Sequence, residues 1–170
     1  SSLLECLGEH NLASGNTVLD LYGSRDGEGL AWLRSSHAKD RKILLLHGDN
    51  VDVESSFPAK NVSKLTLGDL ENFDILVSAT PLYISPSQEY REVNRVLDLL
   101  YKRQSYSRLV YAIVREAANI FYSRLRVSRD QLLAKSEATY LLRESRHMGL
   151  SLGLDSLRFY SIDVDVRSVC

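Results

Sequence analysis

A continuous apolar segment, Leu109 to Val114, constrains the fold of this chain more than any other feature. A charged pair, Arg115 and Glu116, follows it directly. A strand with one face in water alternates apolar and polar residues, so a run without alternation predicts a strand covered on both faces. A second such run extends from Ile43 to Leu46. Strands of this kind are typical of parallel sheets, and we expect both runs in one sheet.

Segments typical of strands alternate with segments typical of helices. The expected strands are Asn16–Tyr22, Lys42–His47, Phe73–Val77, Leu109–Val114 and Leu150–Leu154. Phe159–Val164 is expected as a last extended segment, and Leu30–Leu33 fits a short helix or a strand. The expected helices are Ser2–Gly8, Gln88–Tyr101 with Ser87 as its cap, Ala117–Leu125 and Asp130–Met148. This alternation predicts an α/β fold, a three-layer, mostly parallel β-sheet with helices on both faces.

The length of the chain and the absence of a dividing segment favour a single domain. It has 170 residues, of which 44% are hydrophobic, which is enough for one domain with a sizeable core. Neither an internal repeat nor a low-complexity tract nor a linker divides the sequence. We therefore expect residues 1–170 to form a single domain.

Charge and cysteine content exclude several classes of protein. The 21 Lys and Arg residues against 22 Asp and Glu residues exclude a generally basic nucleic-acid coat, although a local basic patch stays open. The two cysteines, Cys6 and Cys170, form no CxxC motif, which argues against a disulfide framework or a structural zinc site. No apolar run has the length of a membrane span, and the first residues do not resemble a signal peptide. We therefore expect a cytoplasmic protein without a membrane partner.

Polar residues follow most of the expected strands. In open α/β sheets, ligands bind outside the carboxyl ends of the strands, so these residues are the first candidates for a site. Strand ends are also polar because the chain turns there in water, which gives each residue a structural interpretation as well. The candidates are Arg25, Asp26, Glu28, His47, Asp49, Asp52, Ser78, Thr80, Arg115, Glu116, Asn119, Asp155, Ser156 and Arg158.

Three stretches, taken in order, resemble the FtsK–HerA branch of the additional-strand P-loop ATPases, which are DNA-pumping motors. Ser1–Leu7 resembles the helix that follows the Gly-Lys of a Walker A loop. Leu109–Phe121 resembles the Walker B strand and the Asp-Glu-Ala-His-Asn-Leu after it. Glu144–Arg158 resembles the helix, glycine turn and sensor strand of that branch. The resemblance implies a P-loop NTPase-like domain, and we expect a fragment that starts just after the phosphate loop.

The resemblance also implies roles for individual residues. Glu116 falls at the position that polarises the attacking water, and Arg158 falls at the end of the sensor strand. Ser1, Ser2 and Arg115 fall at the nucleotide, with the Ser1 hydroxyl on the metal. The implied ligands are ATP and Mg²⁺. The implied function is the ATPase core of a DNA-translocating or genome-packaging motor that works as a homo-oligomeric ring.

Two groups of basic residues lie outside these motifs. Arg124, Arg126 and Arg129 form the densest basic cluster and are candidates for contact with DNA phosphates, or else a solvated face. Arg146 and His147 lie near the end of the long expected helix, where cations complement the helix dipole. Their functional interpretation is contact with the nucleotide of a neighbouring subunit.

The sequence departs from the family pattern at chemically important places. The glycine-rich loop and its lysine, which cradle the phosphates, are absent from these residues, so the residues before Ser1 decide the ATPase interpretation. Arg115 stands where the Walker B Asp is expected, and Leu157 stands where a Gln is expected. Arg115 has two interpretations: contact with phosphate charge, or an ion pair with a carboxylate such as Asp155.

Two further functions stay open. The missing phosphate loop and Arg115 favour a catalytically inactive, P-loop-like scaffold or partner-binding subunit. The acidic residues of the chain favour a metal-dependent nuclease, since hard cations bind clustered carboxylates, although Asp after a strand is also ordinary turn chemistry. The carboxylates of such a site would be Asp49, Asp52 and Glu54, joined by Asp163 and Asp165.

Overall fold

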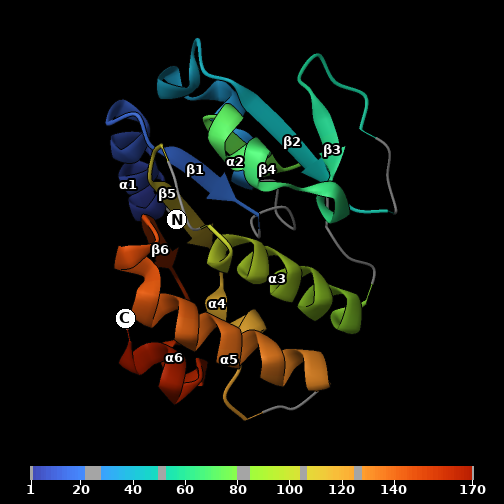
Figure 1. Cartoon of the computed structure of the whole chain (residues 1–170), viewed down its shortest axis with the longest axis vertical. Helices are drawn as coiled ribbons and strands as arrows, with labels where there is room; N and C mark the ends of the chain where they lie inside the picture. Colours follow the sequence, from blue (N-terminus) through green and yellow to red (C-terminus); the bar gives the residue numbers. More distant parts are fainter. Residues whose placement is uncertain are drawn as a thin grey trace.

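A sheet of parallel strands, six of them within the described residues, lies at the centre of the protein (Figure 1). The computed structural model describes residues 2–21, 28–49, 53–79, 85–103, 107–124 and 128–169. The strands are β1 (Thr17–Asp20), β2 (Ile43–His47), β3 (Ala59–Asn61), β4 (Ile75–Ser78), β5 (Val110–Val114) and β6 (Leu150–Leu154). Their order in the sheet is β3-β2-β4-β1-β5-β6, so that strands distant in sequence are neighbours.

The described part of the chain also forms six α-helices around the sheet, with short 3₁₀ segments between them. The α-helices are α1 (Ser2–Ala13), α2 (Leu67–Asn72), α3 (Pro86–Tyr101), α4 (Ala117–Ile120), α5 (Arg129–Glu144) and α6 (Val164–Ser168). The 3₁₀ segments are η1 (Glu28–Arg34), η2 (Ser36–Ala38), η3 (Val62–Lys64), η4 (Ser145–His147) and η5 (Phe159–Ser161). Within the described residues, no helix is long and apolar enough to cross a lipid bilayer.

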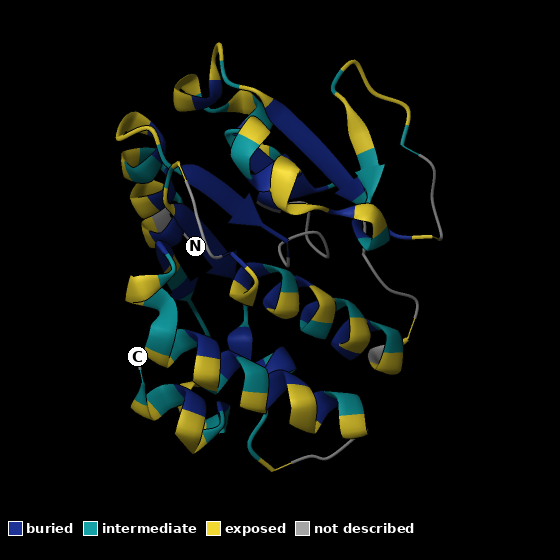
Figure 2. Cartoon of the chain, viewed as in Figure 1, coloured by how far each residue is buried: buried dark blue, intermediate teal, exposed yellow. Residues whose placement is uncertain are grey.

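Each face of the sheet has its own apolar core, which explains why the strands do not alternate apolar with polar residues. On β5, Val110, Ala112 and Val114 belong to the core under α3 and α5. Tyr111 and Ile113, which point to the opposite face, belong to the core under α1 and η1. Figure 2 shows the central strands buried and the outward faces of the helices exposed.

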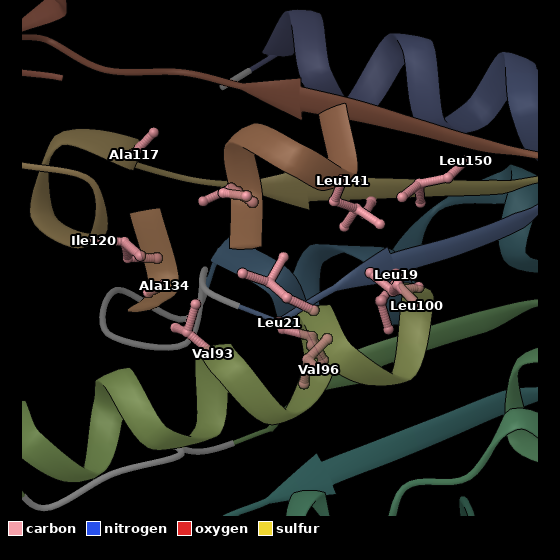
Figure 3. Packing of buried hydrophobic residues seen from close by; sticks show 14 of the residues in the cluster. Leu19, Leu21, Val93, Val96, Leu100, Ala117, Ile120, Ala134, Leu141 and Leu150 are labelled. Carbon is pink, nitrogen blue, oxygen red and sulfur yellow. The ribbon is translucent and has the colours of Figure 1, made fainter. Parts of the chain in front are cut away.

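The larger core lies between the sheet and the helices α3 and α5, which pack against each other. Val93 and Val96 of α3 lie near Leu21, which follows β1, and Leu141 of α5 lies toward β5 and β6 (Figure 3). The predicted α/β fold, with a parallel sheet and helices on both faces, is therefore confirmed.

The prediction of an extended segment over Phe159–Val164 is wrong. Phe159–Ser161 forms the 3₁₀ segment η5, and the Asp163 side chain caps α6 by accepting the Asp165 N–H at 3.1 Å. Tyr160 is 86% exposed, so this segment does not have the burial of an inner strand. An Asp that accepts a local backbone N–H competes with strand pairing and favours a helix start.

The bounds of the four expected helices also differ in the structure. α1 continues past Gly8 to Ala13, because Gly8 does not end the helix but makes room for Trp32: a Cβ there would lie 2.6 Å from the indole ring. α4 ends at Ile120, after which Tyr122 makes an antiparallel bridge with Ile162. α3 begins at Pro86, and the Ser85 side chain caps it. α5 ends at Glu144 and is followed by the 3₁₀ segment η4. Neither α2 nor β3 is among the elements expected from the sequence.

Candidate functional site

Arg115 lies in a buried ion pair with Asp20 at the carboxyl ends of two neighbouring strands. The Arg115 Nη2 donates to Asp20 Oδ2 at 2.7 Å, and its Nε lies 3.3 Å from both Asp20 oxygens. Asp20 is completely buried and Arg115 is 6% exposed. Trp32 Nε1 also donates to Asp20 Oδ2, at 2.9 Å, and Glu5 of α1 accepts from Arg115 Nη2 at 3.2 Å. This cluster ties α1 and η1 to the sheet.

The carboxylates that pair with Arg115 differ from the one expected from the sequence. The carboxylate named from the sequence, Asp155, does not pair with it; Asp20 and Glu5 do. Two carboxylates therefore compensate one guanidinium, and the local charge at the end of β5 is not positive. The sequence carried a signal for Asp20, an acidic residue inside the otherwise apolar stretch Val18–Leu21, but its burial could not be read from that alone.

Glu116 has an unusual backbone conformation. Its φ of 46° and ψ of 56° place it in the left-handed region, which non-glycine residues rarely occupy. The Glu116 N–H donates to Asp155 Oδ1 at 2.7 Å, across from β5 to the end of β6. Strained residues of this kind persist where the surrounding structure holds them, and they cluster at functional sites.

The Glu116 carboxylate is held by the turn after β6. Ser156 Oγ donates to Glu116 Oε1 at 2.8 Å, and the Leu157 N–H donates to Oε2 at 3.2 Å. The residue is partly exposed, so one side of the carboxylate faces solvent while the other is fixed. A carboxylate oriented in this way at a strand end can accept a proton from water or from a substrate hydroxyl.

Arg158 completes this group of residues. Its Nη2 donates to Asn119 Oδ1 of α4 at 3.1 Å, and its N–H donates to Ser156 Oγ at 3.1 Å. We call Glu116, Asn119, Asp155, Ser156 and Arg158 the Glu116 corner. It brings a fixed carboxylate and an exposed guanidinium together at the carboxyl ends of β5 and β6, where the parallel-sheet rule predicts a ligand site.

A buried tyrosine lies under α1 on the same strand as Arg115. Burial raises the pKa of the Tyr111 hydroxyl, and the Asp20 charge raises it further, while Arg115 lowers it. No described residue makes a hydrogen bond with this hydroxyl. Gly153 on β6 leaves the space for it, because a Cβ at that position would collide with the Tyr111 hydroxyl and with Leu4 of α1.

The remaining residues predicted to take part are dispersed. Ser1 lies outside the described residues, and Ser2 begins α1, although its side chain is not described. Arg146 and His147 are exposed on η4, which enters the amino end of β6 and so lies at the opposite end of that strand from Arg158.

The basic cluster is described only in part. Arg124 is exposed in the segment after α4, and Arg129 is exposed at the first position of α5. Arg126 lies outside the described residues. The two described arginines flank the start of α5.

The acidic residues considered for a metal site do not gather in the part of the chain that the structure describes. Asp49 accepts from Asn61 Nδ2 at 2.6 Å beside β2 and β3, and Glu54 is exposed farther along that connection. Asp52 lies outside the described residues. Asp163 and Asp165 lie at α6, in a different part of the molecule from β2 (Figure 1). Among the described residues, no three His, Cys, Asp or Glu side chains could share a metal ion.

Comparison with known proteins gives matches among solved structures alone. No protein-family model matches the chain, and no curated protein matches it. One similar structure is the genome packaging NTPase B204 from Sulfolobus turreted icosahedral virus 2 in complex with AMP, with a TM-score of 0.43 and 16% identity over 91% of this chain and 71% of that chain. The same protein in complex with AMPPCP has a TM-score of 0.42 and 16% identity over 91% and 72%.

Proposed function

We propose that this chain is the nucleotide-hydrolysing core of a DNA-translocating or genome-packaging motor, with Glu116 as the residue that orients the attacking water. The observation that carries the proposal is the Glu116 carboxylate, fixed by Ser156 and the Leu157 N–H at the carboxyl end of β5. A general base needs a defined position, and two donors from the neighbouring strand end supply that position.

Arg158 is the second functional group of the proposal. Its exposed guanidinium lies in the same corner as Glu116 and is steadied by Asn119 Oδ1. A guanidinium carries a permanent positive charge and binds phosphate oxygens through paired N–H groups. Arg158 therefore stabilises the charge that develops on a transferred phosphoryl group, while Glu116 acts on the water.

The proposed ring assembly has a candidate contact surface next to this corner. Leu157 is 96% exposed and Tyr160 is 86% exposed, and Phe159 between them is also exposed. Exposed apolar side chains in one stretch are typical of surfaces that another protein covers. A second copy seated here would close the Glu116 corner from solvent.

Magnesium does not fit the described residues. The position at which the resemblance implies an acidic ligand holds Arg115, and its two carboxylate partners are occupied by it. The Ser1 hydroxyl, the other implied ligand, lies outside the described residues. No step of the proposed mechanism therefore passes through the ion, and ATP enters as the substrate.

The test is ATP turnover by the full-length protein. Glu116→Gln keeps the size of the side chain but removes its basicity, so kcat should fall by about 10²–10⁴ with a small change in KM. Glu137→Gln, the same change on α5 and outside the Glu116 corner, is the matched control and should leave kcat unchanged. Equal turnover by the Glu116→Gln variant and the wild type would remove Glu116 from the mechanism.

A partner-binding scaffold is the second candidate, and the Arg115–Asp20 pair favours it. A buried guanidinium stands at this strand end in place of the acidic ligand that the resemblance implies, and it pairs with Asp20 instead of leaving that carboxylate for a cation. If the protein is such a scaffold, the full-length protein should bind its partner but should not turn over ATP. Turnover that depends on Glu116 would exclude it.

A further inference from the structure

A polar groove of about 530 Å³ lies between α5 and α6 and shares no residue with the Glu116 corner. Its size is in the range of small-molecule sites. One wall is the face of α5 that carries Lys135, and the other wall is formed by the start of α6. The polar and charged residues along these walls include Lys135, Ser136, Thr139, Arg143, Asp163 and Asp165.

Lys135 is the first sign that the groove is built for a ligand. The side chain is 9% exposed, and its ammonium has three N–H donors. Within the described part of the chain it makes one hydrogen bond, a long one of 3.2 Å to Asp163 Oδ2. A buried ammonium with unused donors is unfavourable unless another acceptor is present, so the geometry calls for an acceptor in the groove.

Arg143 provides a second cation on the same face of α5. It lies two helical turns after Lys135, about 12 Å along the axis, with Thr139 between them. Arg143 is exposed and makes neither a hydrogen bond nor an ion pair with any described residue. The two long side chains can converge above Thr139, whose hydroxyl donates to the Lys135 carbonyl at 2.8 Å and keeps its lone pairs free.

The opposite wall carries two carboxylates. Asp163 accepts from Lys135 and from the Asp165 N–H, and the Asp165 carboxylate is exposed without a hydrogen-bond donor among the described residues. The four charges of the groove sum to zero, so a polyanion such as nucleic acid would meet two carboxylates as well as two cations. A molecule with one anionic end and several hydroxyls matches both walls.

We propose that this groove binds a small phosphorylated polyol, with its phosphate on Lys135 and Arg143 and its hydroxyls donating to Asp163 and Asp165. The cations supply charge-assisted hydrogen bonds to the phosphate oxygens, and Ser136 adds an exposed hydroxyl beside them. The carboxylates accept from hydroxyl groups and select against inorganic phosphate. The site is independent of the proposed hydrolysis at Glu116.

The experiment is calorimetric titration of the full chain with ribose 5-phosphate, and separately with inorganic phosphate and with ribose. Ribose 5-phosphate should bind more tightly than inorganic phosphate, and ribose should not bind. Arg143→Gln should weaken ribose 5-phosphate roughly tenfold, because it removes one charge-assisted hydrogen bond to the phosphate. Arg146→Gln, an exposed arginine on η4 outside the groove, is the control and should leave the affinity unchanged.

A second variant separates the two walls. Asp165→Asn should weaken the binding of ribose 5-phosphate, but it should not weaken the binding of inorganic phosphate, because it removes a carboxylate that repels this anion. Arg143 and Asp165 are both exposed, so Arg143→Gln and Asp165→Asn should unfold at the same midpoint temperature as the wild type. Thermal unfolding of each variant is measured in parallel. The proposal is overturned if neither phosphate compound binds at millimolar concentration, or if Arg143→Gln and Arg146→Gln bind ribose 5-phosphate equally well.

Discussion

The Arg115 side chain reaches from the end of β5 to Asp20 at the end of β1, where Nη2 and Oδ2 lie 2.7 Å apart in the interior. The pair joins two central strands and, through Glu5 and Trp32, the segments that cover one face of the sheet. Arg115, which would be expected to repel a cation from the candidate site, therefore has a structural role. Breaking its pair with Asp20 should lower the free energy of unfolding.

Replacing Asp20 by Asn should destabilise the fold strongly. The change removes the charge of the completely buried carboxylate that pairs with the Arg115 guanidinium, and breaking a buried pair in this way costs about 3–5 kcal/mol. Urea unfolding measures the difference. Glu5→Gln is the matched comparison: the Glu5 side chain is 34% exposed, so this change should cost at most about 1 kcal/mol. Equal effects of the two variants would contradict the assigned role of Asp20.

Glu116→Gly should separate the effect of backbone strain on stability from the effect of the carboxylate on ATP turnover. Glycine adopts the left-handed conformation without the penalty of about 1 kcal/mol that other residues incur, but the variant also loses the bonds from Ser156 and the Leu157 N–H. These contributions oppose each other, so the free energy of unfolding should stay within about 1 kcal/mol of the wild type. ATP turnover by the full-length protein should be abolished. A destabilisation of several kcal/mol would show that the role of Glu116 is structural.

Gly153 and Tyr111 should show a non-additive effect on stability. Gly153→Ala introduces a Cβ into the space of the Tyr111 hydroxyl and of Leu4, an overpacking that costs about 1–3 kcal/mol. Tyr111→Phe removes a buried hydroxyl that has no hydrogen-bond partner among the described residues, so it should be neutral or stabilising. The double variant should recover part of the stability. A double-mutant cycle of thermal or urea unfolding measures this coupling, and strictly additive values would contradict it.

Asp74 should contribute to the loss of stability in acid. Burial raises the pKa of its carboxyl, but the Lys42 N–H and Arg108 outweigh burial, and the pKa in the folded state lies below its usual value. A lowered pKa stabilises the fold above the unfolded-state value, and the contribution disappears as the pH falls below about 4. Asp74→Asn should therefore flatten the acid side of the curve of unfolding free energy against pH. An unchanged acid limb would contradict the assignment.

The proposed binding of DNA should appear in the salt dependence of the affinity. Replacing Arg124, Arg126 and Arg129 by Gln should reduce the slope of log K against log salt by about 0.9 for each phosphate that is no longer neutralised. Replacing Arg91 and Arg95, two exposed arginines on α3, is the control. If the control lowers the slope as much as the triple variant does, the cluster is not the DNA surface.

The sheet could be predicted from the sequence because burial on both faces leaves a direct signal. The runs at 43–46 and 109–114 lack polar residues because each strand contributes to two cores, one under α3 and α5 and one under α1 and η1. β3 was not predictable in this way, since Ala59–Asn61 is a short, polar edge strand without a periodic pattern. The helix α2 was missed because its six residues are too few for a clear apolar stripe, although Thr66 and Asp69 form a capping box.

The Glu116 corner was predictable only as a collection of strand ends. Parallel strands bring their carboxyl ends to one edge, so Glu116, Asn119, Asp155, Ser156 and Arg158 could all be named as candidates. Which of them touch depends on the order of the strands and on the left-handed Glu116 backbone, and neither leaves a pattern in the sequence. Asp20 was overlooked for the same reason, because its partner lies on a strand far along the chain.

The position of β1 between β4 and β5 also sets the order in which the protein can form during synthesis. Val18 pairs with Ile75 on one side and with Tyr111 on the other, so β1 leaves the ribosome long before either neighbour exists. At ordinary translation rates the wait for β5 is on the order of 5–20 s. During the first part of that time, before β4 has emerged, β1 lacks both of its neighbours. A holding chaperone that masks residues 17–21 of the nascent chain should therefore raise the yield of native protein in the cell.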